Sequence, residues 1–90
     1  MADADWLARA AHRLHQEAGE LDQLLRSAKF TVLGGTPLFR LAQRDRADAV
    51  FRQLGQAGIL TRPFQARPDW LRFAIPHAPE VWARLRGALA

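Results

Sequence analysis

The first third of the chain carries a stripe of apolar residues that recur at alternating spacings of four and three, which is the period of an α-helix. The stripe predicts one long helix from about residue 5 to residue 28. We expect its apolar face to pack on the sheet of its own domain, and the same face places Trp6 in the core. The members of the stripe are Leu7, Ala11, Leu14, Ala18, Leu21, Leu25 and Ala28.

Four short β-prone runs follow this helix, and they come in two pairs. The first pair is Phe30–Leu33 and Leu38–Ala42, separated by the turn signal Gly-Gly-Thr-Pro at residues 34–37. This pair reads as two strands or as one strand with a sharp interruption. The second pair is Ile59–Arg62 and Trp70–Ile75, joined by a loop that contains two prolines.

Two further helices complete the pattern. One is predicted from Arg46 to Ala57, with Gly58 as the residue that ends it, and the last begins at Pro79 and places Trp82 on its apolar side. The order α-β-β-α-β-β-α predicts an α+β fold. We expect one domain over residues 1–90, a sandwich in which a small, mainly antiparallel sheet packs against helices.

Charge is distributed unevenly along this pattern. The net charge is +4, with −2 over residues 1–28 and +6 over residues 29–90. A basic surface is compatible with nucleic acid, but ordinary solvated surfaces also carry this much charge. An RNA-binding sheet needs exposed aromatic side chains. Phe39, Phe64 and Phe73 alternate with arginines and are expected to face the core, so the sequence argues against nucleic acid as a partner.

Two arginines in the last strand pair, Arg62 and Arg72, stand where alternation places them opposite the large apolar side chains. A guanidinium group never deprotonates and needs acceptors for its donors. Asp69 is the one acidic residue between them. Either a partner carboxylate satisfies each arginine or a ligand does, and a carboxylate or phosphate bound bidentately is the natural candidate. Trp70 begins the strand of Arg72 and can shape a pocket there.

Other chemistry finds little support in the sequence. The only serine, Ser27, lies outside any nucleophile motif, and His12 and His15 are two histidines without a third metal ligand. Lys29 is the single lysine and lies at a helix end without a glycine-rich or serine-rich anion site. We therefore expect no catalytic residue and no metal site within these residues.

The chain has no cysteine, so it forms neither a disulfide nor a thiolate metal site. No apolar run reaches membrane-spanning length, and the first residues lack the apolar core of a secretory signal. These features predict a cytoplasmic protein without a membrane partner.

Three motifs together resemble a known family. They are Gly-Gly-Thr-Pro-Leu-Phe-Arg-Leu at residues 34–41, Gly-Ile-Leu-Thr-Arg-Pro-Phe at 58–64 and Trp-Leu-Arg-Phe-Ala-Ile-Pro at 70–76. In this order they resemble the carboxy-terminal small domain of fold-type I pyridoxal-phosphate enzymes. The resemblance is nearest to threonine-phosphate decarboxylase and the cobalamin-biosynthesis protein CobC, which are related to histidinol-phosphate aminotransferase, and it spans nearly the whole chain.

The resemblance implies roles for both arginines. Arg72 occupies the position that clamps the α-carboxylate of the substrate, and Arg62 the position that helps to bind the phosphate of a phosphorylated amino acid. Such enzymes hold pyridoxal phosphate in a large domain by a Schiff-base lysine and by asparagine and tyrosine contacts. This chain has no tyrosine and no asparagine, and Lys29 does not lie in the lysine motif.

The resemblance therefore implies the substrate-binding part of a longer enzyme, with the large domain as its partner. The 90 residues alone are expected to hold no cofactor and to be inactive. Decarboxylation and transamination both stay open, as does a homodimer. Two other readings stay open as well: a stand-alone basic module that binds RNA or senses a small acid, and an interaction domain that associates through the long helix.

Overall fold

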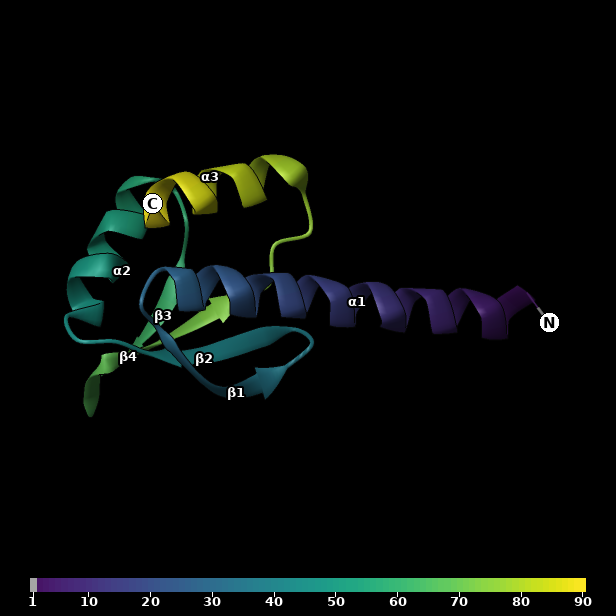
Figure 1. Cartoon of the computed structure of the whole chain (residues 1–90), viewed down its shortest axis with the longest axis horizontal. Coiled ribbons are helices and arrows are strands. Elements are labelled where there is room, and N and C mark those ends of the chain that lie inside the picture. Colours follow the sequence, from purple (N-terminus) through teal and green to yellow (C-terminus); the bar gives the residue numbers. More distant parts are fainter. Residues whose placement is uncertain (1) are drawn as a thin grey trace.

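The computed structural model describes residues 2–90, with side chains from Asp5 onward. The predicted order α-β-β-α-β-β-α is confirmed (Figure 1). The elements are α1 (Ala2–Ser27), β1 (Thr31–Thr36), β2 (Phe39–Gln43), α2 (Ala47–Gln56), β3 (Thr61–Phe64), β4 (Arg67–Ala74) and α3 (Pro79–Leu89). The glycine turn separates two strands, β1 and β2, rather than interrupting one.

The four strands form one antiparallel sheet in the order β1-β2-β4-β3. Each hairpin joins strands that are consecutive in sequence, and β2 and β4 meet in the middle. Two register shifts, one in β1 and one at the end of β3, mark local irregularities. This architecture confirms the predicted α+β fold with an antiparallel sheet packed against helices.

The core lies between the helices and one face of the sheet. Alternate residues of β2 and β4 point to that face, where Ala42, Leu71 and Phe73 are buried. The helix α1 crosses β1 and β2, whereas α2 crosses β3 and β4 and packs on α3 (Figure 1). Since the residues on the other face of β2 and β4 are half buried or exposed, the helices cover one face of the sheet and leave the other open.

An ion pair ties α1 to the covered face. The Nε atom of Arg40 in β2 donates to Oδ1 of Asp22 at 2.8 Å, and both side chains are largely buried. The second arm of the same guanidinium donates from Nη1 to the carbonyl oxygen of Thr36 at 2.8 Å. Burial of Arg40 is therefore compensated by a charge-assisted bond and a backbone acceptor.

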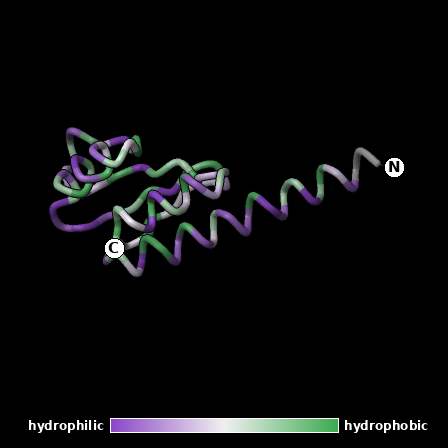
Figure 2. The backbone as a smooth tube through the Cα atoms, turned by 90° about the horizontal axis from the view of Figure 1, so that it is seen from above, coloured by the Kyte–Doolittle hydropathy of each residue, from purple (hydrophilic) through white to green (hydrophobic). Residues whose placement is uncertain are grey.

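The long helix consists of a packed half and a projecting half. Ala18, Leu21 and Leu25 are completely buried, but Leu7 is 61% exposed and Trp6 is 63% exposed. Figure 2 shows the first half of α1 extending away from the body of the molecule. The expectations that the whole stripe packs on the sheet and that Trp6 is a core residue were wrong, because the sheet is shorter than the helix.

The ends of the helices agree closely with the sequence pattern. α1 begins at Ala2 and ends at Ser27, against the predicted 5 and 28. Gly58 has φ 79° and follows the end of α2, where the amide of Ile59 donates to the carbonyl oxygen of Leu54 at 2.9 Å. Because glycine has no Cβ atom, it adopts this left-handed conformation at little energetic cost, and this explains why residue 58 is glycine. Trp82 is 7% exposed, as predicted.

Candidate functional site

The two predicted arginines lie side by side on the open face of the sheet. Arg62 in β3 is directly opposite Arg72 in β4, and Leu41 in β2 is opposite Arg72 on its other side. Directly opposed residues of antiparallel strands have Cα atoms roughly 4.5–5.5 Å apart, with both side chains on the same face. The structure therefore brings together two cations that are ten positions apart in the chain.

A shallow hollow of about 420 Å³ surrounds this pair. Its walls come from the β1–β2 turn, the start of β3 and the end of β4. Leu38 and Leu60, which are 64% and 87% exposed, stand beside the charged groups. The lining residues are Leu38, Phe39, Leu60, Thr61, Arg62, Arg72 and Ala74. The hollow combines two fixed positive charges with an apolar rim, which suits a small organic anion.

No carboxylate of the chain neutralises this pair among the side chains from residue 5 onward. Each ion pair found there joins other groups, and Asp69, the acid nearest in sequence, contacts Arg67 and Gln43 instead. Bonds from Arg67 and then from Gln43 hold the pKa of the Asp69 carboxyl below its usual range. Asp69 is therefore already engaged, and the pair of arginines is left for an anion from elsewhere.

Phe39 supports one of the two arginines. The guanidinium carbon of Arg72 lies 5.1 Å from the centre of the Phe39 ring, within the range of a cation–π contact. Phe39 is opposite Ala74, a small residue, and its ring reaches the neighbouring Arg72. Sequence reasoning placed Phe39 in the core, and this was wrong because the ring lies on the open face.

A second aromatic group occupies the same face, farther from the arginine pair. Phe64 meets Trp70 edge to face with ring centres 5.8 Å apart, and Arg67 lies 4.3 Å over the Trp70 ring. The expectation that Phe64 faces the core was therefore also wrong, whereas Phe73, which is buried against Phe30, does face it. Trp70 is not among the residues that line the hollow around Arg62 and Arg72.

The glycine turn positions Phe39. Gly35 has φ 144°, and a Cβ atom at this position would clash with the carbonyl oxygen of Phe39. The amide of Leu38 donates to Oγ1 of Thr36 at 3.1 Å, which closes the turn. A side chain at residue 35 would therefore push away the strand that carries Phe39.

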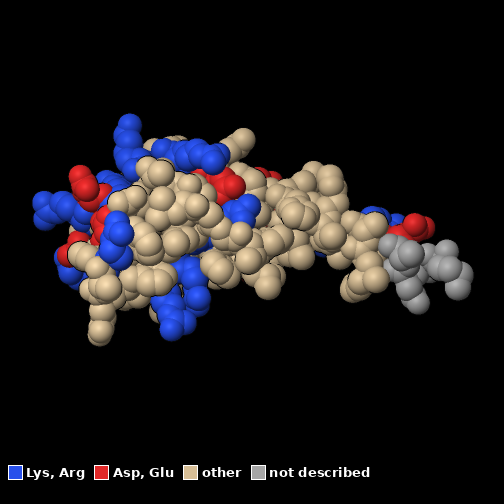
Figure 3. All heavy atoms as spheres, turned by 90° about the horizontal axis from the view of Figure 1, so that it is seen from below, with Lys and Arg blue, Asp and Glu red and all other residues tan. Residues whose placement is uncertain are grey.

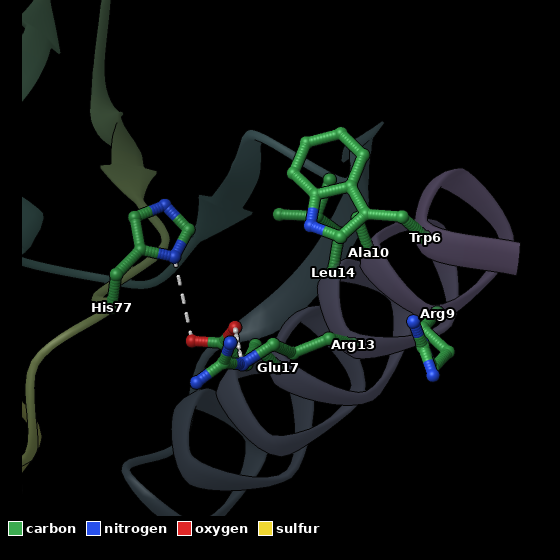
Figure 4. Close-up of a pocket in the computed structure, with 7 residues that line it drawn as sticks. All are labelled: Trp6, Arg9, Ala10, Arg13, Leu14, Glu17 and His77. Carbon is green, nitrogen blue, oxygen red and sulfur yellow. Dashed lines mark ion pairs between the residues drawn. The ribbon is translucent and has the colours of Figure 1, made fainter. Parts of the chain in front are cut away.

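A larger hollow lies elsewhere (Figure 4). It measures about 630 Å³ and is formed by one side of the projecting half of α1 and by His77. Nδ1 of His77 lies 3.4 Å from Oε2 of Glu17, and Nε of Arg13 lies 4.0 Å from Oε1 of the same carboxylate. Because Glu17 is already paired with Arg13 and His77, and one helix makes nearly all of the wall, we prefer the smaller hollow as the candidate site.

Lys29, the single lysine, does not lie near the arginine pair. Lys29 is exposed, has φ 73° and lines a different hollow at the junction of α1 and α2, away from Arg62 and Arg72. In the described part of the chain, no three His, Asp or Glu side chains are placed to hold a metal ion. None of the helices in residues 2–90 combines the length and apolar character needed to cross a membrane.

Charge is distributed differently over the body of the molecule and over the projecting part of α1. Seen from below, Lys and Arg side chains gather around the body of the molecule, whereas the projecting part of α1 shows mostly uncharged atoms (Figure 3). The projecting part of the helix thus offers a largely uncharged surface on this side.

Comparison with known proteins points in one direction. No family model matches the sequence. The chain is 39% identical to a threonine-phosphate decarboxylase of Sinorhizobium sp over 90 residues, which cover 100% of this chain and 27% of that protein. It is 38% identical to a threonine-phosphate decarboxylase of Pseudomonas aeruginosa over 77 residues, which cover 86% of this chain and 23% of that protein. The chain thus spans about a quarter of the length of the curated relatives it matches.

Proposed function

We propose that this chain is the substrate-binding part of a pyridoxal-phosphate-dependent enzyme of the threonine-phosphate decarboxylase type, in which Arg72 binds the α-carboxylate of the substrate and Arg62 contacts its phosphate. The relatives carry that name, and the sequence similarity to one of them extends over the whole chain. In this proposal a larger cofactor-binding domain is the partner of the chain. The 90 residues by themselves are expected to be inactive.

One observation carries the proposal. Arg62 and Arg72 are opposite each other on the open face, and no carboxylate among the described side chains pairs with either. Like charges directly opposite each other destabilise a sheet, so this arrangement costs folding energy unless an anion relieves it. A substrate with two anionic groups on a short carbon skeleton supplies one partner for each guanidinium, and the planar fork of arginine matches a carboxylate bidentately.

The role of these residues is to bind and orient. Pyridoxal phosphate, held by the partner domain, supplies an electron sink for bond cleavage at the α-carbon. In this chain Lys29 lies in a separate hollow and does not fit the role of the cofactor lysine. Arg72 fixes one end of the substrate and Arg62 the other, so that together they set the direction of the bonds at the α-carbon. Decarboxylation and transamination use the same two contacts.

Titration of the isolated chain tests the site directly. O-phosphothreonine added at millimolar concentrations to the ¹⁵N-labelled protein should shift the side-chain Nε–H resonances of Arg62 and Arg72. Arg72→Ala should remove most of the binding. Arg52→Ala provides the matched control, because Arg52 is an exposed arginine of α2 that pairs with Asp48 and lies outside the hollow. Equal binding by the wild type and Arg72→Ala would refute the assignment.

A chimera tests the enzymatic half of the proposal. The Sinorhizobium decarboxylase, with its matching segment replaced by this chain, should decarboxylate threonine phosphate. In that chimera Arg72→Ala should lower kcat/KM. The loss should correspond to about 2–4 kcal/mol of transition-state stabilisation, the range expected for a lost charge-assisted pair. A folded chimera whose activity does not depend on Arg72 would exclude the carboxylate role.

The open face also favours a second candidate, a stand-alone module for single-stranded RNA. Phe39, Phe64 and Trp70 lie on that face beside arginines, which is the combination that such binders use. Binding of a labelled oligonucleotide that weakens steeply with salt would support this function. An absence of binding at low salt would dismiss it. The apolar rim of the hollow and the similarity to the decarboxylases favour the small anion.

A further inference from the structure

We infer that Phe39 is a positioning residue for Arg72, and that the glycine turn before it serves to place its ring beneath the guanidinium group. The inference rests on the proposed carboxylate role of Arg72 and goes beyond it, because it assigns a role to an uncharged residue and to a turn. Among the described residues, neither Phe39 nor the turn forms a hydrogen bond or an ion pair with Arg62 or Arg72.

The electrostatic setting of Arg72 explains why it needs support. Arg62 is directly opposite and repels it, and no acid among the side chains from Asp5 onward holds it in place. The ring of Phe39, with its centre 5.1 Å from the guanidinium carbon, is the one aromatic contact of Arg72 in that range. A free arginine side chain samples many rotamers, and ordering them on binding lowers affinity.

A contact with the Phe39 ring leaves the N–H donors of Arg72 free for a ligand. An aromatic ring attracts a guanidinium group through its charge, and this attraction uses none of the N–H donors as hydrogen bonds. Those donors are the ones that grip a carboxylate bidentately. Phe39 therefore restricts the orientation of Arg72 without occupying its donors, which an aspartate partner in the same place would do.

The local backbone places the ring. Thr36 is opposite Phe39 across the first hairpin, and Ala74 is opposite Phe39 in β4. The amide of Ile75 donates to the carbonyl oxygen of Leu38 at 3.2 Å and fastens the turn to the end of β4. Gly35 allows the backbone of Phe39 to approach closely, and the small residue Ala74 lies opposite Phe39. The turn is thus linked to the same strand that carries Arg72.

The first readout needs no ligand. Ring current shifts a proton that lies over an aromatic face upfield, so the Arg72 Nε–H proton of the wild-type chain should resonate upfield of its position in Phe39→Leu. Phe39→Trp should keep the upfield shift, because indole is the better cation–π partner. Phe64→Leu is the matched control, since Phe64 lies on the same face against Trp70 and is not a lining residue of the hollow. An Arg72 proton with the same shift in the wild type and in Phe39→Leu would overturn the inference.

The second readout measures the carboxylate specifically. O-phosphothreonine and 1-aminopropan-2-yl phosphate differ by the carboxylate alone, so the ratio of their dissociation constants reports the Arg72 contact. Phe39→Leu should reduce the preference for the carboxylate by about two- to fivefold, the effect of losing an exposed cation–π contact, and Phe39→Trp should restore it. Phe64→Leu should leave the ratio unchanged.

The outcomes separate the inference from the proposed function. If the wild type shows no preference for the carboxylate, the role of Arg72 fails, whereas the ring-current shift still decides whether Phe39 orients it. If the wild type prefers the carboxylate and Phe39→Leu keeps the full preference, the inference fails and the proposed function stands. Phe39→Met serves as a second variant where Phe39→Leu loses the dispersed amide spectrum of the folded chain.

Discussion

The two faces of the sheet treat arginine in opposite ways. On the covered face Arg40 is largely buried and bonded to Asp22 at 2.8 Å, so its charge is satisfied inside the chain. On the open face Arg72 has a like charge opposite it and an aromatic ring beneath it, without an acid among the described side chains. The difference separates an arginine that stabilises the fold from one that is available to a ligand.

The largest effect should come from the covered face itself. Leu71 is completely buried next to Phe73, and Leu71→Ala should lower the free energy of unfolding by about 2–5 kcal/mol because it leaves a cavity in the core. Leu60→Ala removes the same atoms at a site that is 87% exposed and should change stability by less than about 0.5 kcal/mol. Urea denaturation followed by circular dichroism measures both. Similar losses in the two variants would contradict the assignment of the core to one face.

The next effect should come from the internal ion pair. Asp22→Ala leaves Arg40 largely buried without its acceptor and should cost about 1–3 kcal/mol of unfolding free energy. The double variant Asp22→Leu, Arg40→Met should recover most of that loss, because two apolar side chains leave no unpaired charge. A double variant as unstable as Asp22→Ala would show that the ion pair contributes more to stability than the compensation of its own buried charges.

The open face should respond with the opposite sign. Arg62→Gln removes a like-charge opposition and should leave stability unchanged or raise it by up to about 0.5 kcal/mol at low salt. The gain should vanish at high salt, where the repulsion is screened. Added phosphate should raise the melting temperature of the wild type more than that of Arg62→Gln. A clear loss of stability in Arg62→Gln would mean that Arg62 is a structural residue like Arg40.

The smallest effect concerns pH. Hydrogen bonds from Arg67 and Gln43 lower the pKa of Asp69 in the folded chain, so its ionised form stabilises the fold above the ordinary aspartate pKa. That stabilisation is lost as the pH falls through the lowered folded-state value. Asp69→Asn should therefore be slightly less stable than the wild type at neutral pH and equal to it at strongly acidic pH, as denaturation at a series of pH values would show.

The order of elements could be predicted from the sequence because helix and strand periods differ. The choice of sheet face could not always be predicted. In residues 39–42 the alternation correctly separates Phe39 and Leu41 from Arg40 and Ala42. The pair that contains the charged residue Arg40, however, lies on the covered face. The reason is Asp22, which lies 18 residues earlier and provides the partner for Arg40. Local patterns do not reveal such a partner.

The candidate site could likewise be predicted from the sequence only in part. Alternation placed Arg62 and Arg72 opposite the buried side chains of their strands, and the structure confirms this for the strand of Arg72, where Leu71 and Phe73 are buried. That the two residues are directly opposed follows from the register of β3 against β4, which short strands and a proline-containing loop do not specify. Trp6 was misplaced because a helical stripe predicts a face and not what covers it. The assignments of carboxylate and phosphate to the two arginines stay predictions.

The two halves of α1 have a thermodynamic consequence. The residues from Ala18 to Leu25 are locked into the core, so their amides open only when much of the chain unfolds. The preceding turns have few contacts, and an isolated helical segment of that length is marginal in water. One continuous helix therefore contains a boundary between two cooperative units. Hydrogen exchange along its length would locate that boundary near Ala18, with fast exchange on one side and slow exchange on the other.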